Sequence, residues 1–264
     1  MDAPHGRITY DHPGVITVTI DREAKRNAIS PQMTELYWQA ARELADRDDL
    51  RVMVLTAVGS FFTAGIDIAA ESSGSQRGDP QTRHLHAGWA YRRGYRDHHL
   101  LYDEFEAIEK PIILAAQGTI LGAGVEMSTS CDFRFCTPRA EWGVPEINLG
   151  VIAGSGGSSR LNRLIGPHWT KWMAMANMRV GAEQAKTIGL VHDVFPEATF
   201  MADVYAFCDQ LIGLPTEALG LAKQAIDLAA DISDRNAQRY LDRLTNTSLV
   251  GSPENERRTA RFKK

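Results

Sequence analysis

GTILGAGVE, residues 118–126, is the stretch of this 264-residue chain that decides its fold. It follows Ile112 to Ala116, a short apolar run typical of strands that are covered on both faces. Helical patterning begins at its glycines, so backbone N–H groups are expected to stay free at the start of a helix. We therefore predict a turn, between a buried strand and a helix, that can hold an anionic oxygen.

Two further glycine-bearing segments extend this pattern. FTAGID, residues 62–67, comes after a second buried run, Val52 to Thr56, and precedes helical patterning. GVPE, residues 143–146, runs on to a glycine- and serine-rich turn at residues 154–159. Strands that alternate with helices in this way indicate an α/β fold built from right-handed crossover connections.

Glu126 and Glu146 accompany the glycine segments. Glu126 lies at an apolar helix start, where an ionised carboxylate is costly to bury unless it serves a cavity. A glutamate taken alone is more often a surface or capping residue than a catalytic one. The glycines that flank Glu126 and Glu146 favour a catalytic role instead. The residues therefore predict an oxyanion-binding site that contains two glutamates.

The rest of the chain divides into recognisable parts. A hairpin is expected over Ile8 to Ile20, and a helix over about 31–47 begins at Ser30-Pro31. Prolines separate four expected helices near 199–213, 216–230, 234–248 and 253–264. Residues 71–99 show little apolar periodicity and predict a mobile surface segment. Its histidines (His84, His86, His98 and His99) lack a metal-ligand spacing, so a solvated loop is favoured over a metal site.

Composition limits the classes of function. There are 29 basic and 33 acidic side chains, a formal charge of −4, which argues against a nucleic-acid partner and favours small molecules. Three cysteines, with no CxxC unit, fit a reducing cytoplasm. No apolar stretch is long enough for a membrane span, and the start lacks a secretory signal pattern.

The sequence does not match several nucleotide-binding and hydrolase motifs. Gly118, Gly122 and Gly124 have the glycine spacing of short-chain dehydrogenases, but the segment lies too far along the chain and no Tyr-x-x-x-Lys pair exists. Met127 stands where a GxGxxG motif needs its third glycine, and residues 153–160 lack the Gly-Lys-Ser/Thr of a phosphate loop. No serine near residues 154–159 has the GxSxG pattern of a nucleophile elbow.

Over almost its whole length the sequence resembles the crotonase (enoyl-CoA hydratase/isomerase) superfamily. REAKRNAI, residues 22–29, is similar to the coenzyme A strand-turn motif, and residues 62–68 resemble the loop with the first oxyanion N–H. GAGVE, residues 122–126, resembles the segment with the second N–H and a catalytic glutamate. WGVPE, residues 142–146, followed by Leu149-Gly150, resembles the segment with the second glutamate.

The resemblance implies a fold and roles for individual residues. The expected fold is an α/β spiral of ββα units, with an acyl-CoA core over 1–198 and a C-terminal helical trimerisation region over 199–264. Ile66 and Ala123 are expected to supply the oxyanion N–H groups, Glu126 to activate water, and Glu146 to protonate the α-carbon. Substrate or coenzyme A contacts are expected from Lys25, Arg26, Ala28, Ala64, Gly65, Asp67, Ile68, Gly122, Pro145 and Gly154. Asp67 is expected to cap a helix or to fix its loop.

The resemblance is greatest to enoyl-CoA hydratases, because both glutamates are present. It implies no permanently bound cofactor, coenzyme A being part of the substrate, and a homotrimer or homohexamer. The usual Pro-Gly-x-Gly-Gly-Thr-Gln of the family is AGSGGSS here, residues 153–159, and Phe262 is followed only by two lysines. Because of these departures, the resemblance does not identify the acyl group of the substrate. The alternatives are an isomerase, a dehydratase, a C–C hydrolase or a non-catalytic acyl-CoA-binding subunit.

Overall fold

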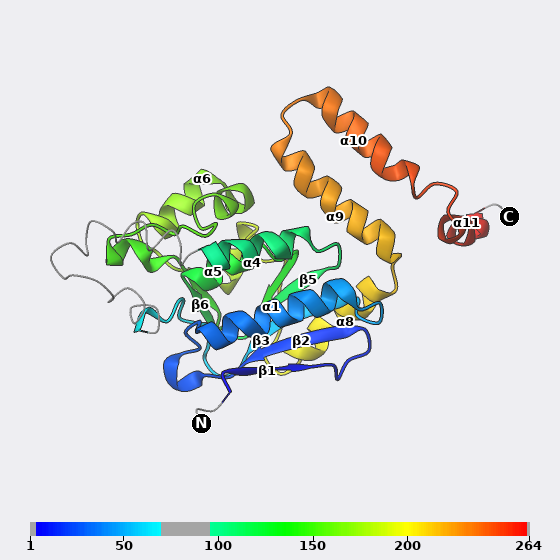
Figure 1. Ribbon diagram of the computed structural model, residues 1–264. Coiled ribbons are helices and arrows are strands. Elements are labelled where there is room, and N and C mark those ends of the chain that lie inside the picture. The colour runs from blue at the N-terminus through cyan, green and yellow to red at the C-terminus, as the bar shows by residue number, and fades with distance from the viewer. Residues whose placement is uncertain (1–3, 70–95, 263–264) are drawn as a thin grey trace.

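The computed structural model describes residues 4–69 and 96–262. Its larger sheet has six strands in the order β1-β2-β3-β5-β7-β10. Strands β1, β2, β3 and β5 of this sheet are labelled in Figure 1. All neighbouring strands in it are parallel except the antiparallel pair β1 and β2, which form the expected N-terminal hairpin. The bounds are β1 Gly6–Thr9, β2 Val15–Ile20, β3 Val52–Ala57, β5 Ile112–Ala116, β7 Phe133–Cys136 and β10 Asp193–Val194.

A second, smaller sheet has the order β4-β6-β8-β9. Its strands are β4 Phe61–Thr63, β6 Thr119–Leu121, β8 Glu141–Gly143 and β9 Val180–Gly181. Each of β3, β5 and β7 in the larger sheet is followed by one strand of the smaller sheet, and then by helical structure. This repeat is the spiral of ββα units, so the predicted α/β crotonase-like fold is confirmed.

Helix α1, Pro31–Asp46, forms for the local reasons that the sequence indicates. Ser30 is its N-cap and accepts a hydrogen bond from the Met33 N–H at 3.4 Å, while Pro31 occupies the first helical position. Its buried residues recur every three or four positions and face the main core: Met33, Tyr37, Ala40, Ala41 and Leu44. A second apolar cluster lies between the larger sheet and α8, Phe200–Ile212.

The remaining helices in the described residues surround the sheets or extend the chain at its C-terminal end. They are α4 Arg96–Ala107, α5 Ala123–Ser128, α6 Arg160–Ala174, α7 Ala182–Thr187, α9 Thr216–Asp231, α10 Arg235–Thr247 and α11 Pro253–Thr259. Short 3-10 helices are η1 Glu23–Lys25, η2 Pro145–Leu149 and η3 Ala260–Phe262. None of the described helices is long and apolar enough to cross a membrane.

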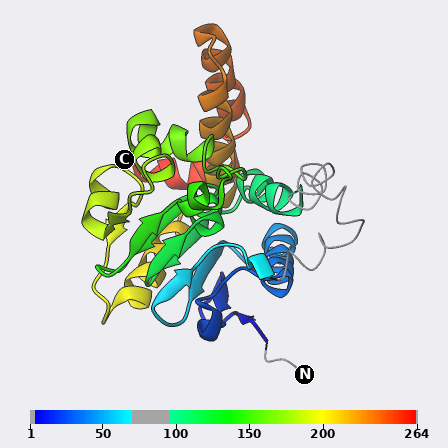
Figure 2. The same ribbon diagram turned by 90° about the vertical axis from the view of Figure 1, so that its left-hand side faces the viewer.

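The four C-terminal helices begin within two residues of their predicted starts. Helices α9 and α10 pack against each other and stand away from the sheets (Figures 1 and 2). Lys223 anchors α9 to the body, because its Nζ donates to the Phe105 carbonyl at 2.7 Å and pairs with Asp132 at 3.1 Å. The division of the chain at residues 198 and 199 stays a prediction.

The predicted surface segment over 71–99 is wrong at its C-terminal end. Residues 71–95, which include His84 and His86, lie outside the described residues, but α4 already begins at Arg96. Leu101, Tyr102 and Phe105 of α4 are fully buried in the main core. The first turn of α4, which carries His98 and His99, is polar, so its apolar periodicity begins only after the helix has started.

Candidate active site

Three neighbouring parallel strands of the smaller sheet end at one edge, and each leads into a predicted site segment. Strand β4 leads to Gly65 and Ile66, β6 to Gly122 and Ala123, and β8 to Glu146. Ligands of α/β proteins bind outside the carboxyl ends of parallel strands. The strand order therefore brings together segments that are far apart in the sequence.

The two glycine turns lie in contact with each other. Gly65 has a φ of +94° and Gly122 a φ of +56°, values that side-chain-bearing residues rarely adopt. A Cβ added to Gly122 would lie 3.7 Å from the Gly65 Cα, and one added to Gly65 would lie 3.8 Å from the Ala123 nitrogen. Within the described residues, neither the Ile66 N–H nor the Ala123 N–H donates a hydrogen bond. Both amides are therefore available to a ligand oxygen.

Glu126 is fully buried in α5, one turn from Gly122. Its Oε1 accepts hydrogen bonds from the Ser155 N–H at 2.6 Å and the Gly157 N–H at 3.2 Å. Two backbone donors stabilise the ionised form of a buried carboxylate. The glycine- and serine-rich turn thus forms the immediate surroundings of Glu126, a role that the sequence interpretation missed.

Glu146 approaches the same helix start from η2. A Cβ added to Gly122 would lie 2.7 Å from the Glu146 Oε1, so this glycine leaves room for the carboxylate. The Oε2 atom is buried and has no hydrogen-bond partner within residues 4–69 and 96–262. Burial raises the pKa of Glu146, because the charged form is poorly solvated there. This glutamate is therefore suited to hold a proton.

The raised pKa of Glu146 predicts a pH-dependent effect on stability. The folded state binds this proton more tightly than the unfolded state, whose carboxyl has a pKa near 4.5. The contribution of Glu146 to stability is therefore fully present below that pH, and is lost as the pH rises through the folded-state pKa. Glu146→Gln should raise the Tm relative to wild type at pH 7, and this gain should shrink at pH 4. Thermal unfolding at both pH values measures it, and a Tm at pH 7 below that of wild type contradicts it.

The predicted coenzyme A turn is tied to the first oxyanion loop by Asn27. Asn27 is fully buried with a φ of +54°, and its side chain accepts from the Arg22 N–H and donates to the Val58 and Phe61 carbonyls. Thr63 Oγ1 donates to the Asn27 carbonyl at 2.7 Å. The sequence motif contains Asn27, but its spacing carries no sign of these long-range contacts.

Lys25 and Arg26 are exposed on this turn, beside the loop. The Ala64 N–H donates to the Arg26 carbonyl at 2.9 Å, so the turn that carries the two cations lies next to the loop that bears Gly65. Ala28 is half-buried, between Asn27 and Ile29. Ile29 is bridged to the loop, since its N–H donates to the Gly65 carbonyl at 2.8 Å.

The Asp67 carboxylate is held by an arginine distant in the sequence and by a backbone N–H of its own segment. Its Oδ2 lies 2.6 Å from Arg22 Nη1, and its Oδ1 accepts from the Ala69 N–H at 3.1 Å. The expectation that Asp67 fixes its loop agrees with these contacts, but its partner Arg22 was not predicted. Ile68, the next residue, is exposed.

Pro145 and Gly154 complete the predicted set. Pro145 is the first residue of η2 and precedes Glu146, whereas Gly154 lies in the turn directly before Ser155. Two further residues support α5 and were missed: Tyr102 donates to the Ala123 carbonyl at 3.2 Å, and Arg134 donates to the Ser128 and Cys131 carbonyls. Neither residue belongs to a glycine segment, so no local signal marks it.

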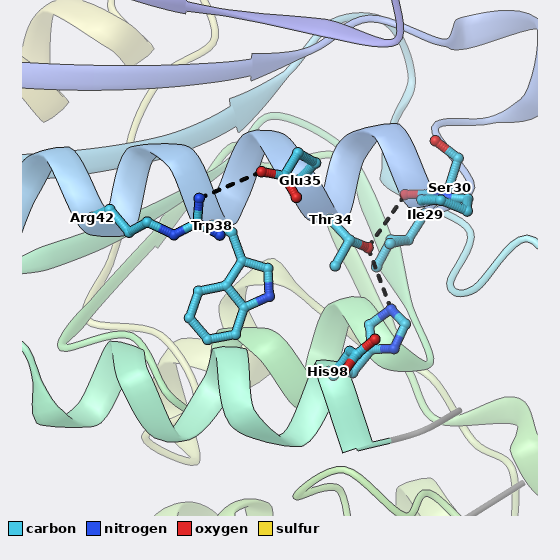
Figure 3. Close-up of a pocket in the computed structure, with 9 residues that line it drawn as sticks. Ile29, Ser30, Thr34, Glu35, Trp38, Arg42 and His98 are labelled. Carbon is cyan, nitrogen blue, oxygen red and sulfur yellow. Dashed lines mark hydrogen bonds and ion pairs between the residues drawn. The ribbon is translucent and has the colours of Figure 1, made fainter. Parts of the chain in front are cut away.

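A pocket of about 380 Å³ lies between α1 and α4 (Figure 3). Its lining mixes apolar and polar side chains: Ile29, Ser30, Pro31, Thr34, Glu35, Trp38, Arg42, Asp97 and His98. Ile29, at one end, is the residue bridged to the Gly65–Ile66 loop. The pocket was not predicted, because it forms only where two helices distant in the sequence face each other.

Comparisons with known proteins identify the family and the fold. The family model described as enoyl-CoA hydratase/isomerase matches residues 11–263. The probable enoyl-CoA hydratase echA8 of Mycobacterium tuberculosis is 28% identical over 239 residues, covering 90% of this chain and 88% of the relative. Carnitinyl-CoA dehydratase of Escherichia coli is 28% identical over 228 residues, covering 86% and 82%. The solved structure of enoyl-CoA hydratase from Bacillus anthracis has a TM-score of 0.86 at 26% identity, and covers 98% of this chain and 96% of that one.

Proposed function

Because this chain belongs to the enoyl-CoA hydratase/isomerase family, we propose that it adds water across the double bond of an α,β-unsaturated acyl-CoA thioester. The observation that carries this proposal is the contact between the two glycine turns. They leave the Ile66 and Ala123 amides without partners in the described chain, at the edge of the sheet where both glutamates lie. The product is a 3-hydroxyacyl-CoA.

The two amides act on the thioester carbonyl. As water adds to the β-carbon, negative charge moves onto the thioester oxygen, and the amides stabilise it as an enolate-like species. Losing one such donor typically costs about 3–4 kcal/mol in activation free energy. The side chains of Ile66 and Ala123 are replaceable in this role, whereas their backbone N–H groups are not.

The two glutamates handle the protons. Glu126, ionised and held by the Ser155 and Gly157 amides, takes a proton from the water whose oxygen bonds to the β-carbon. Glu146, whose pKa is raised by burial, gives its proton to the α-carbon. The proton taken up by one carboxyl balances that released by the other, and the two titrate as a coupled pair.

Coenzyme A is bound as part of the substrate, and the proposed chemistry needs no resident cofactor. Lys25 and Arg26 are exposed cations beside the loop that bears Gly65, which supports a role in contacting the phosphates. The homotrimer or homohexamer remains part of the proposal. Exposed apolar side chains on α9, on α10 and between α10 and α11 support burial against a second copy: Ile226, Leu244 and Val250.

A dehydratase is the second candidate, because dehydration is the reverse of the same step and a carnitinyl-CoA dehydratase is among the relatives. An isomerase, a C–C hydrolase and a binding-only subunit are the other candidates. Two acids beside the oxyanion amides favour addition or loss of water over movement of a double bond.

The test is turnover of a panel of enoyl-CoA thioesters of different chain lengths, with branched and aromatic members. Loss of the enoyl-thioester absorbance together with formation of the 3-hydroxyacyl product is the expected result. A shifted double bond without added water would identify an isomerase. Calorimetric binding of the thioesters without turnover of any member would identify a binding subunit.

A further inference from the structure

Arg160 connects the turn that holds Glu126 to helix α4. It is the first residue of α6, and only 10% of its side chain is exposed. The interpretation of the sequence assigned it no role, and it touches neither glutamate of the proposed site by any described hydrogen bond or ion pair.

One end of this connection is the turn itself. Gly156 has a φ of +115°, and a Cβ added there would lie 3.1 to 3.4 Å from the Arg160 side chain. Arg160 Nη1 lies 3.5 Å from the Ser155 carbonyl, and the Leu161 N–H donates to the Gly156 carbonyl at 3.1 Å. The guanidinium thus contacts the peptide unit that joins Ser155 to Gly156. This unit lies between the two peptide units whose N–H groups, at Ser155 and Gly157, bind Glu126.

The other end is α4. Arg160 Nε and Nη2 donate to the two carboxylate oxygens of Glu106, both at 2.8 Å, and Nη2 also contacts Asp103. A bidentate arginine–carboxylate pair fixes the direction of both side chains, which a lysine at the same place cannot reproduce. Helix α4 is itself fixed in the core by Leu101 and Phe105, so it provides a rigid support.

We propose that Arg160 and Glu106 are a positioning pair that holds the Ser155–Gly157 turn against Glu126 and so keeps this carboxylate ionised and oriented. This inference rests on the proposed hydration reaction, in which Glu126 takes the proton of water. Arg160 acts through the turn, because it donates to a carbonyl of the same peptide segment whose amides reach the glutamate.

Within residues 4–69 and 96–262, charged groups around this turn and its supporting pair come from five elements. Glu126 belongs to α5, Glu146 to η2, Arg160 to α6, and Asp103 and Glu106 to α4, while Asp227, which interacts electrostatically with Glu106, belongs to α9. Removing the guanidinium leaves the two α4 carboxylates without this cation and frees the turn. The Glu126 carboxylate then receives weaker hydrogen bonds from the Ser155 and Gly157 amides, which disfavours its ionised form.

The test compares Arg160→Gln and Glu106→Gln with Arg163→Gln, a control for an exposed arginine one turn further along α6. We expect kcat for hydration to fall about 10- to 100-fold in the first two variants with KM little changed, since misplacing a catalytic group has effects of this size. The acid limb of the pH profile of kcat/KM should move to higher pH in both of these variants. Arg160→Lys should recover only part of the kcat that Arg160→Gln loses. The control should match wild type in all of these.

Hydrogen exchange of the peptide that contains Ser155 to Gly157 gives a readout independent of turnover. Its amides should exchange faster in Arg160→Gln and in Glu106→Gln than in wild type or Arg163→Gln. Unchanged exchange, or a fall in Tm with a wild-type acid limb, would overturn the positioning role. If wild type hydrates no thioester, the proposed reaction fails instead, while the exchange comparison still decides whether the pair holds the turn.

Discussion

Glu126→Gln and Glu146→Gln are each expected to lower kcat for hydration by about 10²- to 10⁴-fold, the usual contribution of a positioned acid or base. Gln at 126 keeps an oxygen that can accept from the Ser155 and Gly157 amides, so the fold should persist while the base is lost. Gln at 146 keeps the volume beside Gly122 but cannot give up a carboxyl proton. Steady-state kinetics across pH, with thioester binding measured separately, checks both variants.

The control for this pair is Glu183→Gln, which changes an exposed glutamate on α7. Its kcat should equal that of wild type. The double variant Glu126→Gln/Glu146→Gln should lose far less than the product of the two single losses, because the two groups act in one step. Wild-type hydration rates in both single variants would show that the proposed mechanism is wrong, even with binding intact.

Gly122→Ala is expected to lower kcat by about 10²- to 10³-fold, the effect of losing one oxyanion donor. Gly122 has a φ of +56° and a ψ of −125°, and an added Cβ would lie 2.7 Å from Glu146 Oε1. Either the turn or the glutamate must shift. The Ala123 N–H and the Glu146 carboxyl, the proposed proton donor, then no longer keep their positions relative to each other. Backbone strain should also cost about 1–3 kcal/mol of stability.

The matched control is Gly181→Ala, which adds the same methyl group at a φ of −78° where no atom lies within 4 Å. Kinetics and thermal unfolding of both variants separate the effect on the site from the effect on the fold. If Gly122→Ala keeps a rate within a few-fold of wild type, the second oxyanion donor is not Ala123.

The parts of the fold that the sequence predicted are those with a local cause. The hairpin follows from the turn at His12 to Gly14, α1 from Ser30-Pro31 and its apolar spacing, and the C-terminal helices from prolines and periodicity. The resemblance implied the second strand of each ββα unit, but the strands of the smaller sheet were not located from the residues, because strands of two or three residues are too short to show a period.

The candidate site divides in the same way. Its glycine segments and both glutamates were predicted from the sequence, and the structure places them at one sheet edge. The interactions of Glu126 with Ser155 and Gly157, of Asp67 with Arg22, and of Tyr102 with the Ala123 carbonyl were not predicted. Each joins residues that only the packing of separate elements brings together.

The sequence by itself predicted the chemistry that is available: two glycine turns with free backbone N–H groups, and two glutamates near them. Only the tertiary structure decided which residues hold those groups in place, because β4, β6 and β8 must pair in register before their ends can meet. Glycine spacing is a property of a few neighbouring residues, whereas the support given by Asn27 and Arg160 depends on contacts across tens of residues.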